Sequence, residues 1–121
     1  MSDLVREIDA AETPTPALWS LGHCGFVIKY QGIVFYVDPN LSLPGAPLSA
    51  SKAINADMIL CTHSSHMDPA TLLAMLDASP RAKVVLPKST AGHAGSLGIS
   101  LDRMTTTDSD LRVEYFKNGP Y

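Results

Sequence analysis

The sequence has few cysteines, few basic residues and no long hydrophobic run. Its 121 residues include 2 cysteines, 9 lysines and arginines and 12 acidic residues, for a formal net charge of −3. Cys24 and Cys61 lie far apart and form no C-x-x-C pair, so they indicate neither a thioredoxin-like site nor a disulfide framework. The basic residues are scattered, whereas nucleic-acid binding needs them clustered. We therefore expect two reduced thiols and no nucleic-acid partner.

Signals for membrane insertion and secretion are also missing. No apolar run approaches the ~18 residues that are needed to span a bilayer. Residues 1–12 are acidic, whereas a signal peptide would begin with basic residues and continue with apolar ones. The sequence thus predicts no membrane span and a cytoplasmic location.

The composition is that of a chain able to form a core. Hydrophobic residues make up 45% of it and charged residues 17%, which is typical of a globular domain. Residues 1–16 are polar, end in Thr13-Pro14-Thr15-Pro16, and show only a weak helical pattern. We expect a loose N-terminal leader over 1–16 and one partial domain over 17–121.

Short runs of β-branched and aromatic residues alternate with turn and helix signals in the rest of the chain. A helix is predicted to begin after Asp68, with Pro69 at its first position, and to end before Pro80; a second is predicted over 88–97, with Gly98 as its end signal. Strands are predicted over 17–21, 26–30, 33–37, 58–61, 84–86 and 111–116. This order predicts an α/β fold with a mixed sheet and helices on one face.

Three of the four histidines follow predicted strands, where α/β sheets usually present their functional groups. These are His23, His63 and His66, and neutral imidazole is a common ligand of transition metals. His63 and His66 could reach one ion or two neighbouring ions, and Asp68 could add a carboxylate oxygen. The structural alternatives are hydrogen-bonded loop histidines at 63 and 66, a buried turn histidine at 23 and a helix N-cap at Asp68. His93 is interpreted as an exposed helix residue.

Two segments resemble the metallo-β-lactamase superfamily. Residues 19–28 read WSLGHCGFVI and residues 32–39 read GIVFYVDP, which is similar to the opening hairpin of that fold. Residues 56–63, ADMILCTH, and 66–69, HMDP, resemble the segment that carries its T-H-x-H-x-D-H metal motif. The similarity is greatest to the branch of the ascorbate-6-phosphate lactonases and N-acyl-phosphatidylethanolamine phospholipases.

The resemblance implies a fold, an activity and a cofactor. The fold would be half of an αββα sandwich. The activity would be metal-dependent hydrolysis of a lactone, ester or phosphoester, with zinc or manganese as the cofactor. Asp38 would have a supporting role at the end of the third strand, and Asp68 matches the aspartate after the last motif histidine. The resemblance identifies no catalytic residue beyond the ligands.

The metal motif is shorter here than in the family. Only Ser64 and Ser65 separate His63 from His66, and serine is a poor zinc or manganese ligand. The family's remaining ligands belong to a second half that would follow Tyr121. We therefore expect a truncated or impaired hydrolase acting on a small molecule, or else a non-catalytic α/β remnant or interaction module. A sheet with helices on one face also predicts a partner for the uncovered face, which would be a second copy of the chain in a homo-oligomer, a separate polypeptide, or a missing C-terminal half.

Overall fold

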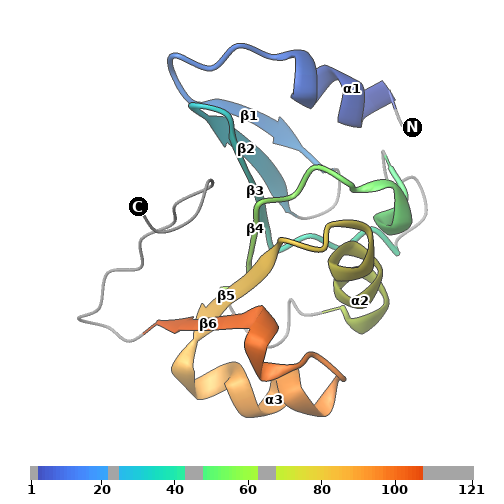
Figure 1. The fold of residues 1–121 in the computed structure, drawn as a ribbon, viewed down its shortest axis with the longest axis vertical. Coiled ribbons are helices and arrows are strands. Elements are labelled where there is room, and N and C mark those ends of the chain that lie inside the picture. Colours follow the sequence, from blue (N-terminus) through green and yellow to red (C-terminus); the bar gives the residue numbers. More distant parts are fainter. Residues whose placement is uncertain (1–2, 22–24, 43–47, 63–67, 108–121) are drawn as a thin grey trace.

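The computed structural model describes residues 3–21, 25–42, 48–62 and 68–107. These residues form a mixed six-stranded sheet with helices, which confirms the predicted α/β class (Figure 1). The strands are β1 (Ala17–Ser20), β2 (Phe26–Tyr30), β3 (Ile33–Val37), β4 (Met58–Leu60), β5 (Lys83–Pro87) and β6 (Met104–Thr107). The α-helices are α1 (Asp3–Ala10), α2 (Pro69–Ala78) and α3 (Ala91–Ser96), and short 3-10 turns are η1 (Ala50–Lys52), η3 (Lys88–Thr90) and η4 (Leu101–Arg103). Within these ranges no helix is long and apolar enough to cross a membrane.

The strands lie in the sheet in chain order, and their direction changes once. β1, β2 and β3 pair antiparallel, whereas β3, β4, β5 and β6 pair parallel. The β2–β3 turn is made by Gln31 and Gly32, whose φ angles of 50° and 80° are those of a tight hairpin turn. Parallel neighbours need a crossover connection, which α2 provides between β4 and β5 and α3 between β5 and β6.

One face of the sheet forms the core with the helices. Val27, Tyr36, Ile59 and Val84 are paired from strand to strand in one row, and all four are fully buried. The core cluster also contains residues of α1, α2 and α3, so these helices cover the same face. Figure 1 shows α1 and α2 along this side of the sheet. The predicted helix after Asp68 and the strands over 26–30 and 33–37 have the expected bounds.

The opposite face is apolar and partly exposed. Leu18, Ile28 and Phe35 form one row across β1, β2 and β3, and Phe26 pairs with Val37 in the next. Exposure reaches 61% at Leu18 and 45% at Phe26. We call this surface the open face, and Tyr30, paired with Ile33, extends it.

The prediction of a loose leader is wrong for residues 3–10. They form α1, and Val5 and Ile8 are fully buried against the sheet. The Lys29 ammonium group in β2 donates to three carbonyl oxygens at the end of this helix, those of Ile8 (2.8 Å), Asp9 (3.0 Å) and Ala11 (2.9 Å). An apolar pair three residues apart is a weak helix signal by itself. Here the helix is stabilised because both apolar side chains pack against the sheet.

The last described strand, β6, was absent from the sequence prediction. Arg103, which directly precedes this strand, anchors its start. The Arg103 guanidinium donates to the carbonyl oxygens of Leu76 (3.0 Å), Ser79 (3.0 Å) and Ala82 (2.9 and 3.1 Å). The strand predicted over 111–116 lies outside the described residues.

Candidate functional site

Asp38 and Thr62 lie at the carboxyl ends of two neighbouring parallel strands, β3 and β4. The Asp38 carboxylate accepts hydrogen bonds from the Thr62 backbone N–H at 2.8 Å and from its hydroxyl at 2.6 Å. The backbone N–H of Asp38 donates to the carbonyl oxygen of Leu60 at 2.7 Å. Ligands of open α/β sheets usually bind beyond this edge, so these contacts mark the candidate site.

Gly25 brings a third segment to the same point. Its φ is 90°, and a Cβ added there would lie 2.7 Å from the carbonyl oxygen of Asp38. The backbone N–H of Leu21 donates to the Gly25 carbonyl at 3.1 Å. Asp38 therefore contacts Gly25, which follows segment 22–24, and Thr62, which precedes segment 63–67.

Asp68 caps helix α2, as the structural alternative predicted. Its Oδ2 accepts hydrogen bonds from the Thr71 backbone N–H (2.9 Å), the Thr71 hydroxyl (2.6 Å) and the Ser42 hydroxyl (2.6 Å). Burial raises the pKa of Asp68, but the hydrogen bonds from Ser42 and Thr71 outweigh it and lower the pKa below its ordinary value. The capping carboxylate is thus ionised at neutral pH.

Ser42 and Thr71 belong to a contact that the sequence analysis did not predict. Thr71 also accepts a hydrogen bond from the Leu41 backbone N–H at 2.9 Å, which ties the chain after β3 to the first turn of α2. An N-cap side chain accepts a hydrogen bond from a backbone N–H two or three residues later, so Asp68 was the available signal for the backbone contact with Thr71. Nothing in the local sequence around Ser42 indicates its partner.

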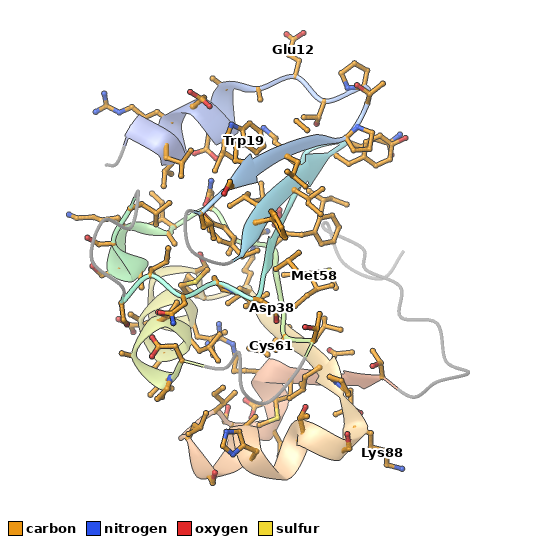
Figure 2. All side chains as sticks on the ribbon, turned by 180° about the vertical axis from the view of Figure 1, so that it is seen from behind. Glu12, Trp19, Asp38, Met58, Cys61 and Lys88 are labelled. Atoms are coloured by element: carbon orange, nitrogen blue, oxygen red, sulfur yellow. The ribbon has the colours of Figure 1, made fainter. Side chains whose placement is uncertain are left out.

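Cys61 lies beside this site as a free cysteine. It directly follows β4, it is buried, and Figure 2 shows it close to Asp38. Burial, and secondarily the negative charge of Asp38, raise the pKa of Cys61 to about 12. The thiol is therefore protonated at neutral pH, which lowers its nucleophilicity. The predicted reduced state of Cys61 agrees with the free thiol in the structure.

Among the predicted metal ligands, Asp68 lies in the described ranges. His63 and His66 lie outside them, as does His23. His93 is exposed on α3, as predicted. Within the described residues no group of three or more His, Cys, Asp or Glu side chains could hold a metal ion. Asp68 remains a predicted ligand whose observed role is that of a helix cap.

The described residues line a cavity at each end of the parallel strands, one at the amino ends and one at the carboxyl ends. The larger, of about 520 Å³, lies at the amino ends of β3, β4 and β5 and contains two buried charged residues. Both have structural roles, because Lys29 caps α1 and the Oδ2 atom of Asp57 accepts a hydrogen bond from the Val34 N–H at 2.9 Å. The smaller, of about 290 Å³, is the carboxyl-edge pocket, lined by Leu60, Cys61, Thr62, Val85, Leu86, Pro87 and Thr107. We assign the candidate site to the carboxyl edge despite its smaller volume, because three loops converge there.

The chain was compared with models of known protein families and with curated proteins. No model of a known protein family matches the chain, and a search of curated proteins found none with significant similarity.

Proposed function

We propose that this chain carries the first half of a metal-dependent hydrolase domain of the metallo-β-lactamase type, that its activity is impaired, and that it binds zinc or manganese through His63 and His66. The observation that carries the proposal is the position of Asp38. Its contacts with Gly25 and Thr62 hold together the ends of the two segments that contain His23 and His63. The change from antiparallel to parallel strands at β3 also suits the first half of an αββα sandwich.

Each described residue has a separate task in this proposal. Thr62 is fixed by Asp38, so the backbone enters the histidine segment from a defined point. Asp68 fixes the exit from that segment by capping α2. Asp38 and Asp68 are therefore positioning residues, and the imidazoles of His63 and His66 would hold the metal in their neutral form.

The bound metal would polarise the carbonyl or phosphoryl oxygen of the substrate and lower the pKa of a water molecule. Hydrolysis then adds the elements of water across the ester bond and releases an acid and an alcohol. Catalytic zinc sites in proteins have three protein ligands, and the shortened motif supplies His63 and His66, with Asp68 engaged as a cap. We therefore propose slow turnover.

A hydrolysis assay tests this function. The chain loaded with zinc or manganese is assayed on neutral esters, lactones and phosphodiesters, with and without a chelator. We expect weak turnover that the chelator abolishes and that the substitution His63→Ala removes, whereas His93→Ala leaves it unchanged. Turnover that is unaffected by the chelator or by His63→Ala would contradict the proposal.

The open face supports a second candidate function, that of a non-catalytic interaction module. Leu18, Phe26 and Tyr30 are large apolar side chains on one sheet surface, and all three are more than one-third exposed. Exposed apolar surfaces of this kind commonly mark protein contacts. A second copy of the chain or a C-terminal half would cover it in the cytoplasm. Absence of bound metal together with stable self-association would favour this candidate.

A further inference from the structure

We propose that the carboxyl-edge pocket receives a short, uncharged, apolar group of the substrate, such as the acyl chain of an ester or the carbon skeleton of a lactone, and disfavours a phosphoryl group. This inference rests on the proposed hydrolase function and narrows its substrate class. The pocket lies at the carboxyl ends of β4, β5 and β6. It includes Thr62, which Asp38 holds in place.

Among the described residues that line the pocket, none carries a charged side chain. These side chains are aliphatic except for the thiol of Cys61 and the hydroxyls of Thr62 and Thr107. Phosphoryl groups in proteins are bound by arginine, lysine or clusters of backbone N–H groups. The carboxylate of Asp38, which accepts hydrogen bonds from the lining residue Thr62, would repel an anion. The electrostatics therefore favour a neutral ligand.

The two hydroxyl groups have internal acceptors. The Thr62 hydroxyl donates to the Asp38 carboxylate at 2.6 Å, and the Thr107 hydroxyl donates to the Leu86 carbonyl oxygen at 3.5 Å. Neither proton is directed to a ligand in this arrangement. A phosphoryl group would lose its hydration in the pocket without gaining equivalent donors, whereas an alkyl group needs none.

The volume of the carboxyl-edge pocket limits the length of the apolar group that can bind there. At about 290 Å³ the pocket is just below the range of roughly 300–1,000 Å³ in which drug-sized ligands bind, and part of it is open to solvent. Burying one methylene group strengthens binding by at most about fourfold. Affinity should therefore increase over a few methylene groups and then stop increasing.

An NMR titration of the full ¹⁵N-labelled chain tests the inference. The probes are N-methylacetamide, N-methylbutyramide and N-methylhexanamide, which the chain would not hydrolyse readily, and methyl phosphate. We expect the amide signals of Leu60, Val85 and Thr107 to shift with the neutral probes. The dissociation constant should fall by up to about fourfold per added methylene, and methyl phosphate should shift none of these signals.

Two near-isosteric substitutions in the pocket wall should have different effects on binding of the neutral probes. Val85→Thr adds a hydroxyl to the wall and should weaken binding of the butyramide several-fold, whereas Thr107→Val extends the apolar wall and should not weaken it. Leu101→Thr, at an exposed position in η4, is the control and should change nothing. The inference would be overturned if methyl phosphate bound more tightly than the amides, or if the dissociation constants of the amides did not depend on their chain length. Amide signals that shift only around the pocket at the amino ends of the strands would also overturn it.

Metal content is measured in the same samples. Background metal with length-dependent binding of the amides would refute the proposed hydrolase and leave the apolar pocket established. Bound metal without amide binding would refute the substrate class and leave the metal site.

Discussion

The carboxylate of Asp38 holds Thr62 through two hydrogen bonds, one to its backbone N–H and one to its hydroxyl. Asp38 itself has a φ of 45°, a left-handed conformation that aspartate tolerates better than most residues. The contact joins the ends of β3 and β4 at the edge of the sheet where the candidate site lies. Because Gly25 packs against the backbone of the same aspartate, the site depends on close approach of three segments.

Substituting Gly25 tests that close approach. Gly25→Ala should lower the free energy of unfolding by about 1–2 kcal/mol for the left-handed backbone, and further because the new methyl group would lie 2.7 Å from the Asp38 carbonyl oxygen. Gly32→Ala is the matched control, since its φ of 80° is similar and its added Cβ meets no atom within 4 Å. Urea unfolding of both variants separates the two effects. Equal losses would show that the contact with Asp38 is not tight.

The cap at Asp68 predicts a pH-dependent contribution to stability. Asp68→Ala should lower the free energy of unfolding by about 1 kcal/mol at neutral pH. Because folding lowers the pKa of this carboxyl, ionised Asp68 stabilises the fold above its ordinary pKa of 3.8, and that stabilisation is lost as the pH falls through the lower folded value. The difference between wild type and Asp68→Ala should therefore shrink below about pH 4.

Asparagine at position 68 provides the control. Asn is a good N-cap and keeps an oxygen acceptor, so Asp68→Asn should retain most of the stability at neutral pH. Denaturant unfolding between pH 3 and pH 7 compares the three proteins. A cost of Asp68→Ala that stays constant over this range would contradict the assigned role of the ionised carboxylate.

Lys29 should be needed for the attachment of α1. Replacement by Met keeps the apolar stem but removes the ammonium group that donates to three carbonyl oxygens. Since hydrogen bonds from charged groups stabilise proteins by about 1.5–3 kcal/mol, Lys29→Met should lower the free energy of unfolding by about 2–3 kcal/mol. It should also speed proteolysis within residues 3–10. Lys52→Met, at an exposed position in η1, should change the stability by no more than about 0.5 kcal/mol.

The open face predicts self-association. Light scattering coupled to size exclusion should show a species larger than a monomer for the wild type, because the apolar rows of β1, β2 and β3 are left partly exposed. The double substitution Leu18→Lys with Phe26→Lys should yield a monomer. Leu101→Lys, which also removes an exposed apolar side chain but outside the sheet, should not. A wild-type monomer that binds no hydrophobic dye would contradict this account of the open face.

Elements with strong local signals were predictable from the sequence, and those that depend on distant partners were not. β2 and β3 have the bounds that their residues predict, since Gln31 and Gly32 define the turn between them. Helix α2 begins as Asp68 and Pro69 indicate. In contrast, α1 is stabilised by Lys29 from β2, and β6 is anchored by Arg103 to carbonyls of the chain around α2. Such contacts join residues about 20 or more positions apart and leave no local pattern.

In the candidate site, too, some residues were predictable from local sequence and others were not. Asp38 and Asp68 are recognisable in the sequence because Asp38 directly follows β3 and Asp68 directly precedes α2. Their partners, Thr62 and Ser42, were not predicted as partners, because hydrogen bonds between segments depend on how the sheet brings those segments together. The metal-binding role of His63 and His66 stays a prediction.

Metal analysis of the purified chain tests the central claim most directly. Wild type, His63→Ala, His66→Ala and His93→Ala are dialysed against zinc or manganese at pH 7.5 and then against metal-free buffer, and bound metal is measured by mass spectrometry. The account predicts near-stoichiometric metal in wild type and His93→Ala, and loss of most of it in His63→Ala and in His66→Ala. Background metal in wild type, or metal that persists in both of the latter variants, would contradict it.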